Sequence, residues 1–343
     1  MPACAISSRS ARNVHNLRSR SIAVTAARWI VIAALAGVLP AHAQTYPAKS
    51  IRLIVPFPAG GGSDAVGRII GLKLGERFGQ QVVVDNRAGA GGSIGTEAAA
   101  KAAPDGYTLV LASTSEIAIN PSLYSKLTYD TVRDLAPVAL VGSTPIVIVV
   151  HPSLPVKSVA DLIKLAKAQP GAINVVSAGT GTTTHLAGEL FRSLVDVKWT
   201  HIPYKGAPPA LTDLASGQVH VMFSSLPGAM PFIRANRIKP IAVSTRARAA
   251  TLPDIPTVIE SGVSAYEVEY WFGIFAPAAT PKDIVARLHE EIAQSLKQPD
   301  VINNLANQGA TPGNVTLPQF ADFVKTEVSK WGQVVKASGA KAD

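Results

Sequence analysis

Short apolar runs alternate with amphipathic stretches along the chain after residue 46. The first series consists of expected strands and helices in alternation, at residues 51–57, 65–78, 82–86, 95–103 and 108–113. Such alternation is typical of parallel βαβ units, in which each helix connects two neighbouring strands of one sheet. The first series therefore predicts an α/β domain.

A second series with the same alternation begins after Pro145. Its β-rich runs and helical patterns lie at residues 146–151, 159–168, 173–177, near 185–194, 219–223 and 238–244. The helix at 159–168 has well-marked ends, because Ser158 and Asp161 can form a capping box and Pro170-Gly171 stops it. The second series predicts another α/β domain.

The C-terminal part carries helical patterns without strands of their own. Residues 283–297 and 318–336 predict two amphipathic helices, and one face of the first carries Ile284, Leu288, Ile292 and Leu296. We expect this apolar stripe to be buried on the first domain, which the chain reaches again by a return crossing near residues 272–277.

The length of 343 residues suits two domains of about 150 residues, each able to bury a core. We assign residues 44–144 with 274–343 to domain 1 and residues 145–273 to domain 2. The predicted fold class is α/β, with two Rossmann-like domains and a ligand cleft between them.

The first 43 residues differ from the rest. They contain five arginines and no acid, then an apolar run at 29–39 that is too short to span a bilayer, and then Ala41-His42-Ala43. A small residue on either side of one other residue is the pattern that signal peptidase cuts. We predict a signal peptide at residues 1–43, cleavage after Ala43 and export to the periplasm; an interfacial anchor that stays attached is the alternative.

Charge and cysteine content change with this cleavage. Loss of the five arginines lowers the formal net charge from +9 to +4, so composition no longer favours a nucleic-acid partner. The single cysteine, Cys4, lies in the segment to be removed. The exported chain therefore has no thiol for catalysis, a disulfide or a metal site.

Two Gly-rich loops each follow an expected strand and precede an expected helix. Residues 56–64 read Pro-Phe-Pro-Ala-Gly-Gly-Gly-Ser-Asp, and residues 177–185 read Ser-Ala-Gly-Thr-Gly-Thr-Thr-Thr-His. Glycine lets backbone N–H groups approach a ligand closely at the carboxyl ends of strands, and a helix N-terminus favours an anion. A pair of such loops, one in each domain, predicts an anion clamp.

The candidate ligand-binding residues follow from these loops. They are Phe57, Ala59, Gly60, Gly61, Ser63 and Asp64 in the first loop and Gly179, Thr180, Gly181, Thr182, Thr183, Thr184 and His185 in the second. Each loop taken alone also fits a tight turn that needs glycine for steric reasons, and Asp64 also fits a helix cap. Tyr204 and Lys205 follow a strand in domain 2 and could lend a hydroxyl or a cation, although a solvated lysine is the alternative.

Other kinds of site have less support. Neither loop has a Gly-Lys-Ser/Thr element, and Thr184 stands where a dinucleotide fingerprint needs glycine, so we expect no phosphate-bearing cofactor. His185 and Glu189 lie one turn apart but lack further ligands nearby, so we expect no metal. A secreted hydrolase using His185 and a threonine hydroxyl remains a rival, but no carboxylate can be assigned to orient the histidine. We therefore expect a binding protein and no enzyme.

Several longer motifs carry a family resemblance. They lie at residues 55–64, 85–96, 103–108, 120–124, 181–186, 203–206 and 272–277. Over residues 46–336 the chain closely resembles the Bug receptors, the TctC-type extracytoplasmic binding proteins of tripartite tricarboxylate transporters. It departs from their usual pattern at Ala88, at His220 and at Ala207-Pro208.

The resemblance implies a type II periplasmic-binding-protein fold whose ligand is held mainly by backbone amides and ordered waters. By position, it places Phe57, Ala59, Gly60 and Asp64 in the first family loop and residues 179–185 in the second. It adds Ser113, Ser115 and Tyr204 as further ligand-binding candidates. The implied ligand is a dicarboxylate, a tricarboxylate, an acidic amino acid or an aromatic acid. A monomer would deliver it to membrane permease subunits, or present it to a sensor-kinase ectodomain.

Overall fold

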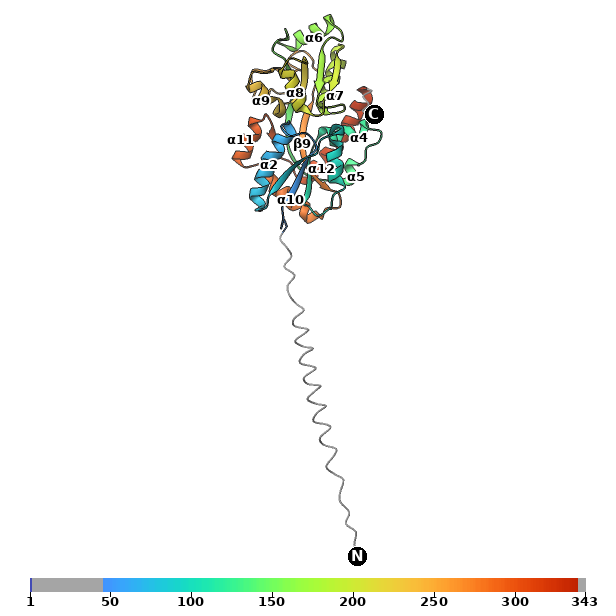
Figure 1. The fold of residues 1–343 in the computed structure, drawn as a ribbon, viewed down its shortest axis with the longest axis vertical. Helices are drawn as coiled ribbons and strands as arrows, with labels where there is room; N and C mark the ends of the chain where they lie inside the picture. The colour runs from blue at the N-terminus through green and yellow to red at the C-terminus, as the bar shows by residue number, and fades with distance from the viewer. Residues whose placement is uncertain (2–45, 339–343) are drawn as a thin grey trace. The chain divides into compact units, whose positions relative to one another are not determined.

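The computed structural model describes residues 46–338 and Met1, and the part from Tyr46 onward forms one compact unit (Figure 1). The predicted signal peptide and its cleavage site lie outside the described residues. Within those residues, none of the helices combines the length and the apolar character that crossing a bilayer requires.

Within residues 46–338 the strands form one sheet of ten. Their bounds are β1 Ile51–Val55, β2 Val82–Asn86, β3 Thr108–Ser113, β4 Leu135–Val150, β5 Asn174–Ser177, β6 Thr200–Pro203, β7 Val221–Ser225, β8 Lys239–Val243, β9 Glu269–Pro277 and β10 Thr311–Pro312. The strand order is β2-β1-β3-β9-β4-β7-β5-β6, and β8 and β10 both pair with β4.

The long strand β4 connects two groups of parallel strands. The parallel pairs predicted from the sequence are present in β1 with β2 and β3, and in β5 with β6 and β7. The prediction was incomplete for β4 and β9, and β4 already begins at Leu135. These two strands are antiparallel to each other; β9 is also antiparallel to β3, and β4 is also antiparallel to β7. The chain leaves the first group along β4 and returns along β9, so the two connecting strands must run in opposite directions.

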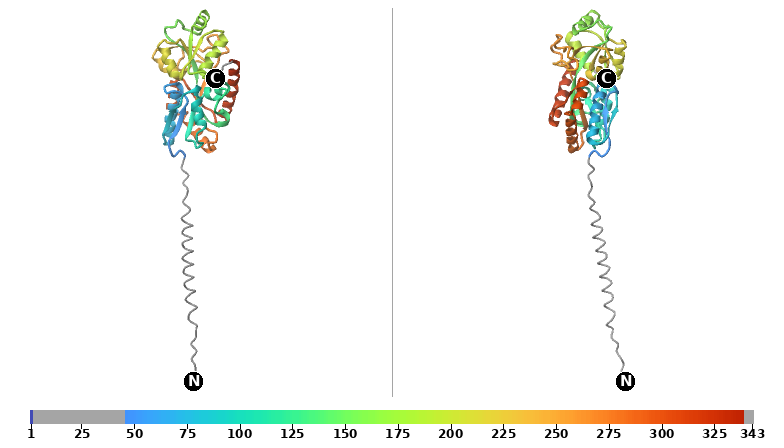
Figure 2. Two further views of the ribbon diagram at one scale, coloured as in Figure 1. Left: turned by 45° about the vertical axis from the view of Figure 1, so that its right-hand side comes forward. Right: turned by 90° about the vertical axis from the view of Figure 1, so that its left-hand side faces the viewer.

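The helices cover this sheet. The longer ones are α2 Gly62–Phe78, α3 Ser93–Ala100, α6 Val159–Ala168, α7 Thr183–Val195, α8 Ala207–Ala215, α9 Leu226–Arg234, α10 Lys282–Ser295, α11 Pro299–Asn307 and α12 Leu317–Ser338. The short ones are η1 Ala90–Gly92, η2 Ser115–Ile119, α4 Asn120–Leu123 and α5 Thr131–Asp134. Figure 2 shows the blue N-terminal and red C-terminal segments side by side, and α12 also contacts α7.

The C-terminal helices pack on elements from early in the chain. Helix α10 contacts α2 and β4, and α12 contacts η2, α4 and β4. Burial of the predicted stripe is confirmed for Leu288, Ile292 and Leu296, while Ile284 is half-buried. The domain boundaries near residues 144 and 273 stay a prediction.

A buried polar contact fixes α12. Trp271 on β9 is 1% exposed and donates from its indole Nε1 to Glu327 Oε2 at 3.0 Å, and Trp331 Nε1 donates to the same oxygen at 3.0 Å. Glu327 also forms an ion pair with Lys330. Two indole donors therefore hold the carboxylate where the helix crosses the sheet.

Candidate functional site

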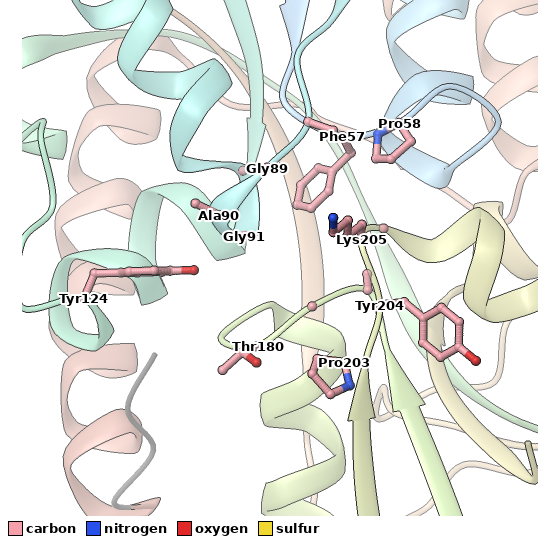
Figure 3. A pocket seen from close by; sticks show the side chains of 15 residues that line it. Phe57, Pro58, Gly89, Ala90, Gly91, Tyr124, Thr180, Pro203, Tyr204 and Lys205 are labelled. Carbon is pink, nitrogen blue, oxygen red and sulfur yellow. The ribbon is translucent and has the colours of Figure 1, made fainter. Parts of the chain in front are cut away.

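Five connections meet around a cavity of about 570 Å³ (Figure 3). They follow β1, β2, β3, β5 and β6, and thus the carboxyl ends of parallel strands, where open α/β sheets bind ligands. Its lining residues are Phe57, Pro58, Ala88, Gly89, Ala90, Gly91, Gly92, Tyr124, Ala178, Gly179, Thr180, Pro203, Tyr204, Lys205 and Gly206.

A smaller space of about 30 Å³ shares part of this lining. Phe57, Pro58 and Ala178 border both, and the smaller space adds Gly61, Gly62, Ser63, Ser115, Thr182, Thr184, Ala207, Pro208, Ser225 and Tyr270. Its size suits a water molecule or one small polar group. The smaller space is therefore rich in hydroxyl groups, whereas the larger one is bordered mainly by glycine, proline, alanine and aromatic residues.

The first loop is shaped by Asp64, which is 5% exposed in the first turn of α2. Its Oδ2 accepts hydrogen bonds from the Gly60 N–H at 2.9 Å and from Arg68 Nε at 3.0 Å, and its Oδ1 accepts from Asn86 at 3.0 Å. Burial raises the pKa of this carboxyl, but the hydrogen bonds from Arg68, Gly60 and Asn86 outweigh it and lower the pKa below its usual value. Asp64 thus orients the loop and borders neither space.

The second loop is held by its own hydroxyl groups. Thr182 caps α7 by accepting from the His185 N–H, Thr184 Oγ1 accepts from the Ala178 N–H at 3.0 Å, and Ser177 Oγ accepts from the Gly179 N–H at 3.2 Å. Backbone donors of this loop are therefore partly used inside it, and the hydroxyls of Thr182 and Thr184 border the smaller space.

Direct contacts join the two sides of the site. Ser115 Oγ lies 2.9 Å from Thr183 Oγ1 and accepts from the Thr183 N–H at 2.9 Å. Gly206 packs on Pro58, where an added Cβ would lie 2.5 Å from the proline Cγ. Residues that follow β1 and β3 thus touch residues that follow β5 and β6.

Two stacked histidines, His185 at the end of the second loop and His201 on β6, contact this loop. The His185 and His201 rings lie 4.0 Å apart, His185 Nδ1 accepts from the Gly181 N–H at 3.1 Å, and His201 Nε2 lies 2.8 Å from Ser177 Oγ. Burial is the main cause that lowers both pKa values, that of His201 to about 4, and the neighbouring His185 adds to the shift of His201. The pair is therefore neutral at pH 7.

Acid is expected to destabilise the protein through this pair. The unfolded His201 takes up a proton near pH 6.5 and the folded one only near pH 4, so the free energy of unfolding falls as the pH drops through this window. At pH 5 these two pKa values correspond to a loss of about 2 kcal/mol, and because His201 is only partly buried, solvent screening reduces the expected loss to about 1 kcal/mol. Urea unfolding at pH 7 and pH 5 measures it: the difference between the two pH values should be smaller in His201→Gln, and equal differences would refute this role.

The predicted site residues fall into three sets. Those that border the larger space are Phe57, Gly179, Thr180 and Tyr204. Those that border the smaller space are Phe57, Gly61, Ser63, Ser115, Thr182 and Thr184. Those that border neither are Ala59, Gly60, Asp64, Ser113, Gly181, Thr183 and His185.

Other lining residues were missed by the sequence reasoning or left out of its candidates. Tyr270 comes from β9 and Ser225 from the end of β7, and no local motif marks either of them. Residues 89–92 were part of a Gly-rich motif and supply positive-φ glycines to the larger space. Lys205 borders that space, and its side chain points into it in Figure 3, whereas the Tyr204 ring points away and its hydroxyl donates to Asp213 at 2.6 Å.

No set of three or more His, Cys, Asp or Glu side chains that could hold a metal ion occurs among the residues that the structure describes. The site consists of helix N-termini, hydroxyl groups, the aromatic residues Phe57, Tyr124 and Tyr270, and Lys205. An α/β chain with such a site at its strand ends fits the class of solute-binding proteins.

Comparison with known proteins identifies the group. Residues 66–340 match the model of the tripartite tricarboxylate transporter family receptor, TctC, and the chain belongs to this family. It is 39% identical over 313 residues to protein BugT of Bordetella pertussis, covering 91% of this chain and 96% of BugT.

Solved structures agree with this assignment. Rpa4515 of R. palustris, determined with adipate, is 37% identical with a TM-score of 0.84, and the match covers 86% of this chain and 98% of that one. MatC of Rhodopseudomonas palustris, with bound malate, is 32% identical with a TM-score of 0.81, and the match covers 84% and 100%. The fold is that of the periplasmic solute-binding proteins of the Bug/TctC type, and the chain is a receptor of this family.

Proposed function

We propose that the protein binds a small carboxylate between its two Gly-rich loops and delivers it to a membrane permease without transforming it. The observation that carries this proposal is the convergence of the N-terminal turns of α2 and α7 on one hydroxyl-lined space. A buried carboxylate must replace its hydration with donors, and helix N-termini and hydroxyls supply them.

The body of the ligand is proposed to occupy the larger cavity. In this arrangement one carboxylate group meets Ser63 and Ser115, and the rest extends past Phe57 towards Lys205. A second carboxylate or another anionic group at the far end would meet the Lys205 ammonium. Adipate and malate, bound by two similar proteins, are both dicarboxylates.

The proposal includes two domains that close on the ligand, residues 44–144 with 274–343 and residues 145–273. The contacts of Ser115 with Thr183 and of Pro58 with Gly206 would form on closure. Residues 1–43 would act as the signal peptide for export to the periplasm, and the exported protein would act as a monomer without a cofactor.

Thermal-shift screening of ligand-stripped protein against mono-, di- and tricarboxylates tests the proposal. A dicarboxylate that binds should raise the melting temperature with its concentration, because binding to the folded state alone stabilises it. Matched uncharged diols and diamides serve as controls and should give no shift. The absence of a shift for every acid in the panel would contradict the carboxylate assignment.

A further inference from the structure

A fully buried carboxyl group follows Ser115, which borders the smaller space, directly in the sequence. Glu116 in η2 is 0% exposed, and its Oε2 accepts hydrogen bonds from the hydroxyl of Ser113 and, at 3.3 Å, from the Ser113 N–H. Its other oxygen, Oε1, has no hydrogen-bond partner within the described part of the chain. Only one of the two carboxyl oxygens of Glu116 therefore has hydrogen-bond partners within the described residues.

This geometry favours the neutral acid. Burying an ionised carboxylate with one oxygen that has no hydrogen bond costs a large desolvation free energy. Burying a neutral carbonyl oxygen in the same place costs far less. Burial raises the pKa of Glu116 to about 8, against the opposing hydrogen bonds from Ser113. Glu116 is therefore protonated at pH 7 and titrates within reach of mildly alkaline conditions.

Hydrogen bonds connect Glu116 to the proposed ligand position. Ser113 Oγ accepts from the Tyr270 hydroxyl at 2.9 Å, and the Tyr270 oxygen lies 3.5 Å from Ser63 Oγ. Tyr270 and Ser63 both border the smaller space. The acid is thus two hydrogen bonds away from a hydroxyl that faces this space.

The neighbouring titratable groups leave Glu116 without a counterion. Tyr129 donates to the Glu116 carbonyl oxygen at 2.6 Å, Tyr270 lies on β9, and the helix α12 that packs on η2 carries Glu327 and Lys330. Lys330 pairs with Glu327, and no ion pair includes Glu116 among residues 46–338. A negative charge at Glu116 would therefore act on an anion nearby without an opposing cation.

We propose that Glu116 is a positioning residue that keeps its proton while a carboxylate is bound, so that ligand binding and protonation of Glu116 are coupled. This inference rests on the proposed function. A protonated Glu116 can donate from Oε2 to Ser113 Oγ, Ser113 can then donate to the Tyr270 oxygen, and the Tyr270 hydroxyl is left to donate towards the ligand carboxylate. An ionised Glu116 accepts from the Ser113 hydroxyl, and Ser113 in turn accepts from the Tyr270 hydroxyl. Tyr270 then no longer donates towards the ligand.

The test is the pH dependence of binding, with adipate and malate as probes. In the unaltered protein, Kd should be steady near pH 7 and weaken about tenfold for each pH unit above the pKa of free Glu116, because a proton must be taken up from solvent with the ligand. In Glu116→Gln, which cannot ionise, Kd should change less than threefold between pH 7 and pH 9.5. Glu327→Gln removes another buried acid, one without a connection to the site, and should keep the slope of the unaltered protein.

Calorimetry of the unaltered protein gives the same information without a substitution. At pH 8.5, titrations in buffers of different ionisation enthalpy should show net proton uptake for each ligand bound. If adipate or malate binds with no proton uptake and a constant Kd up to pH 9.5, the inference is overturned and the proposed function stands. If neither acid nor any other carboxylate binds at pH 7, both are overturned.

Discussion

Replacing Gly62 by valine should weaken ligand binding by at least about 100-fold and leave the fold intact. A Cβ at Gly62 would lie 2.6 Å from Ser225 Oγ and 3.2 Å from the Gly228 nitrogen, so a valine has no room beside α9. In the proposed closure, Gly62 belongs to one domain and residues 225–228 to the other. The valine would therefore hold the domains apart, which removes the donors of one side from the ligand.

Gly71→Ala is the control on the same helix, because Gly71 borders neither space. A Cβ at Gly71 would meet the nearest atoms at 3.5 Å and 3.6 Å, which are ordinary contact distances. Calorimetric Kd values for a carboxylate identified by screening, with melting temperatures of the free proteins, compare the two variants. If Gly62→Val binds as well as Gly71→Ala, closure at α2 and α9 is not needed for binding.

Replacing Trp271 by alanine should lower the free energy of unfolding by about 3–5 kcal/mol, a large part of the total stability of a typical domain. The side chain is 1% exposed and makes edge contacts with Phe320 and Phe323 on α12. Its removal opens a cavity between β9 and α12 and takes one of the two indole donors from Glu327.

Urea unfolding measures this effect. Leu72→Ala is the control, because Leu72 is 71% exposed and its loss should change the free energy of unfolding by less than about 0.5 kcal/mol. Trp271→Phe keeps much of the aromatic volume and removes only the indole donor, so its loss should be intermediate. A Trp271→Ala loss no larger than that of Leu72→Ala would mean that α12 does not depend on this contact.

Strands and helices with strong local patterns were predictable from the sequence. The runs at 82–86 and 108–113 coincide with β2 and β3, and the helix at 159–168 coincides with α6, whose Ser158 cap accepts from the Asp161 N–H at 3.1 Å. Helix α2 begins at Gly62, three residues before its apolar pattern, because the Gly-Ser-Asp sequence of its first turn carries no hydrophobic period.

Non-local pairing limited the prediction of the fold. Residues 135–145 lack a clear period of two, and they form a strand because β9 pairs with them from more than a hundred residues away. The antiparallel direction of β4 and β9 depends on the path of the whole chain. Periodicity within a short window has no information about either feature.

The candidate site was predictable where a loop carries its own ligand-binding groups. Both Gly-rich loops border the cavities, since glycine and hydroxyl residues after a strand have a local sequence signature. Tyr270 and Ser225 had no such signature, because strand pairing brings them to the smaller space. Glu116 had none either, because it is connected to this space only through Ser113 and Tyr270. Tyr204 was expected to lend its hydroxyl to the cleft, but Asp213, nine residues further along, accepts it instead.

The most direct test of the proposed function is a titration of ligand-stripped protein with a dicarboxylate identified by screening. Calorimetry gives the stoichiometry, and proton NMR of the recovered ligand gives its chemical identity. The proposed function predicts one ligand for each chain, saturable binding and recovery of the unchanged acid after prolonged incubation. Conversion of the acid to a product would contradict a role as a binding receptor, and the absence of saturable binding for every carboxylate would contradict the proposed ligand class.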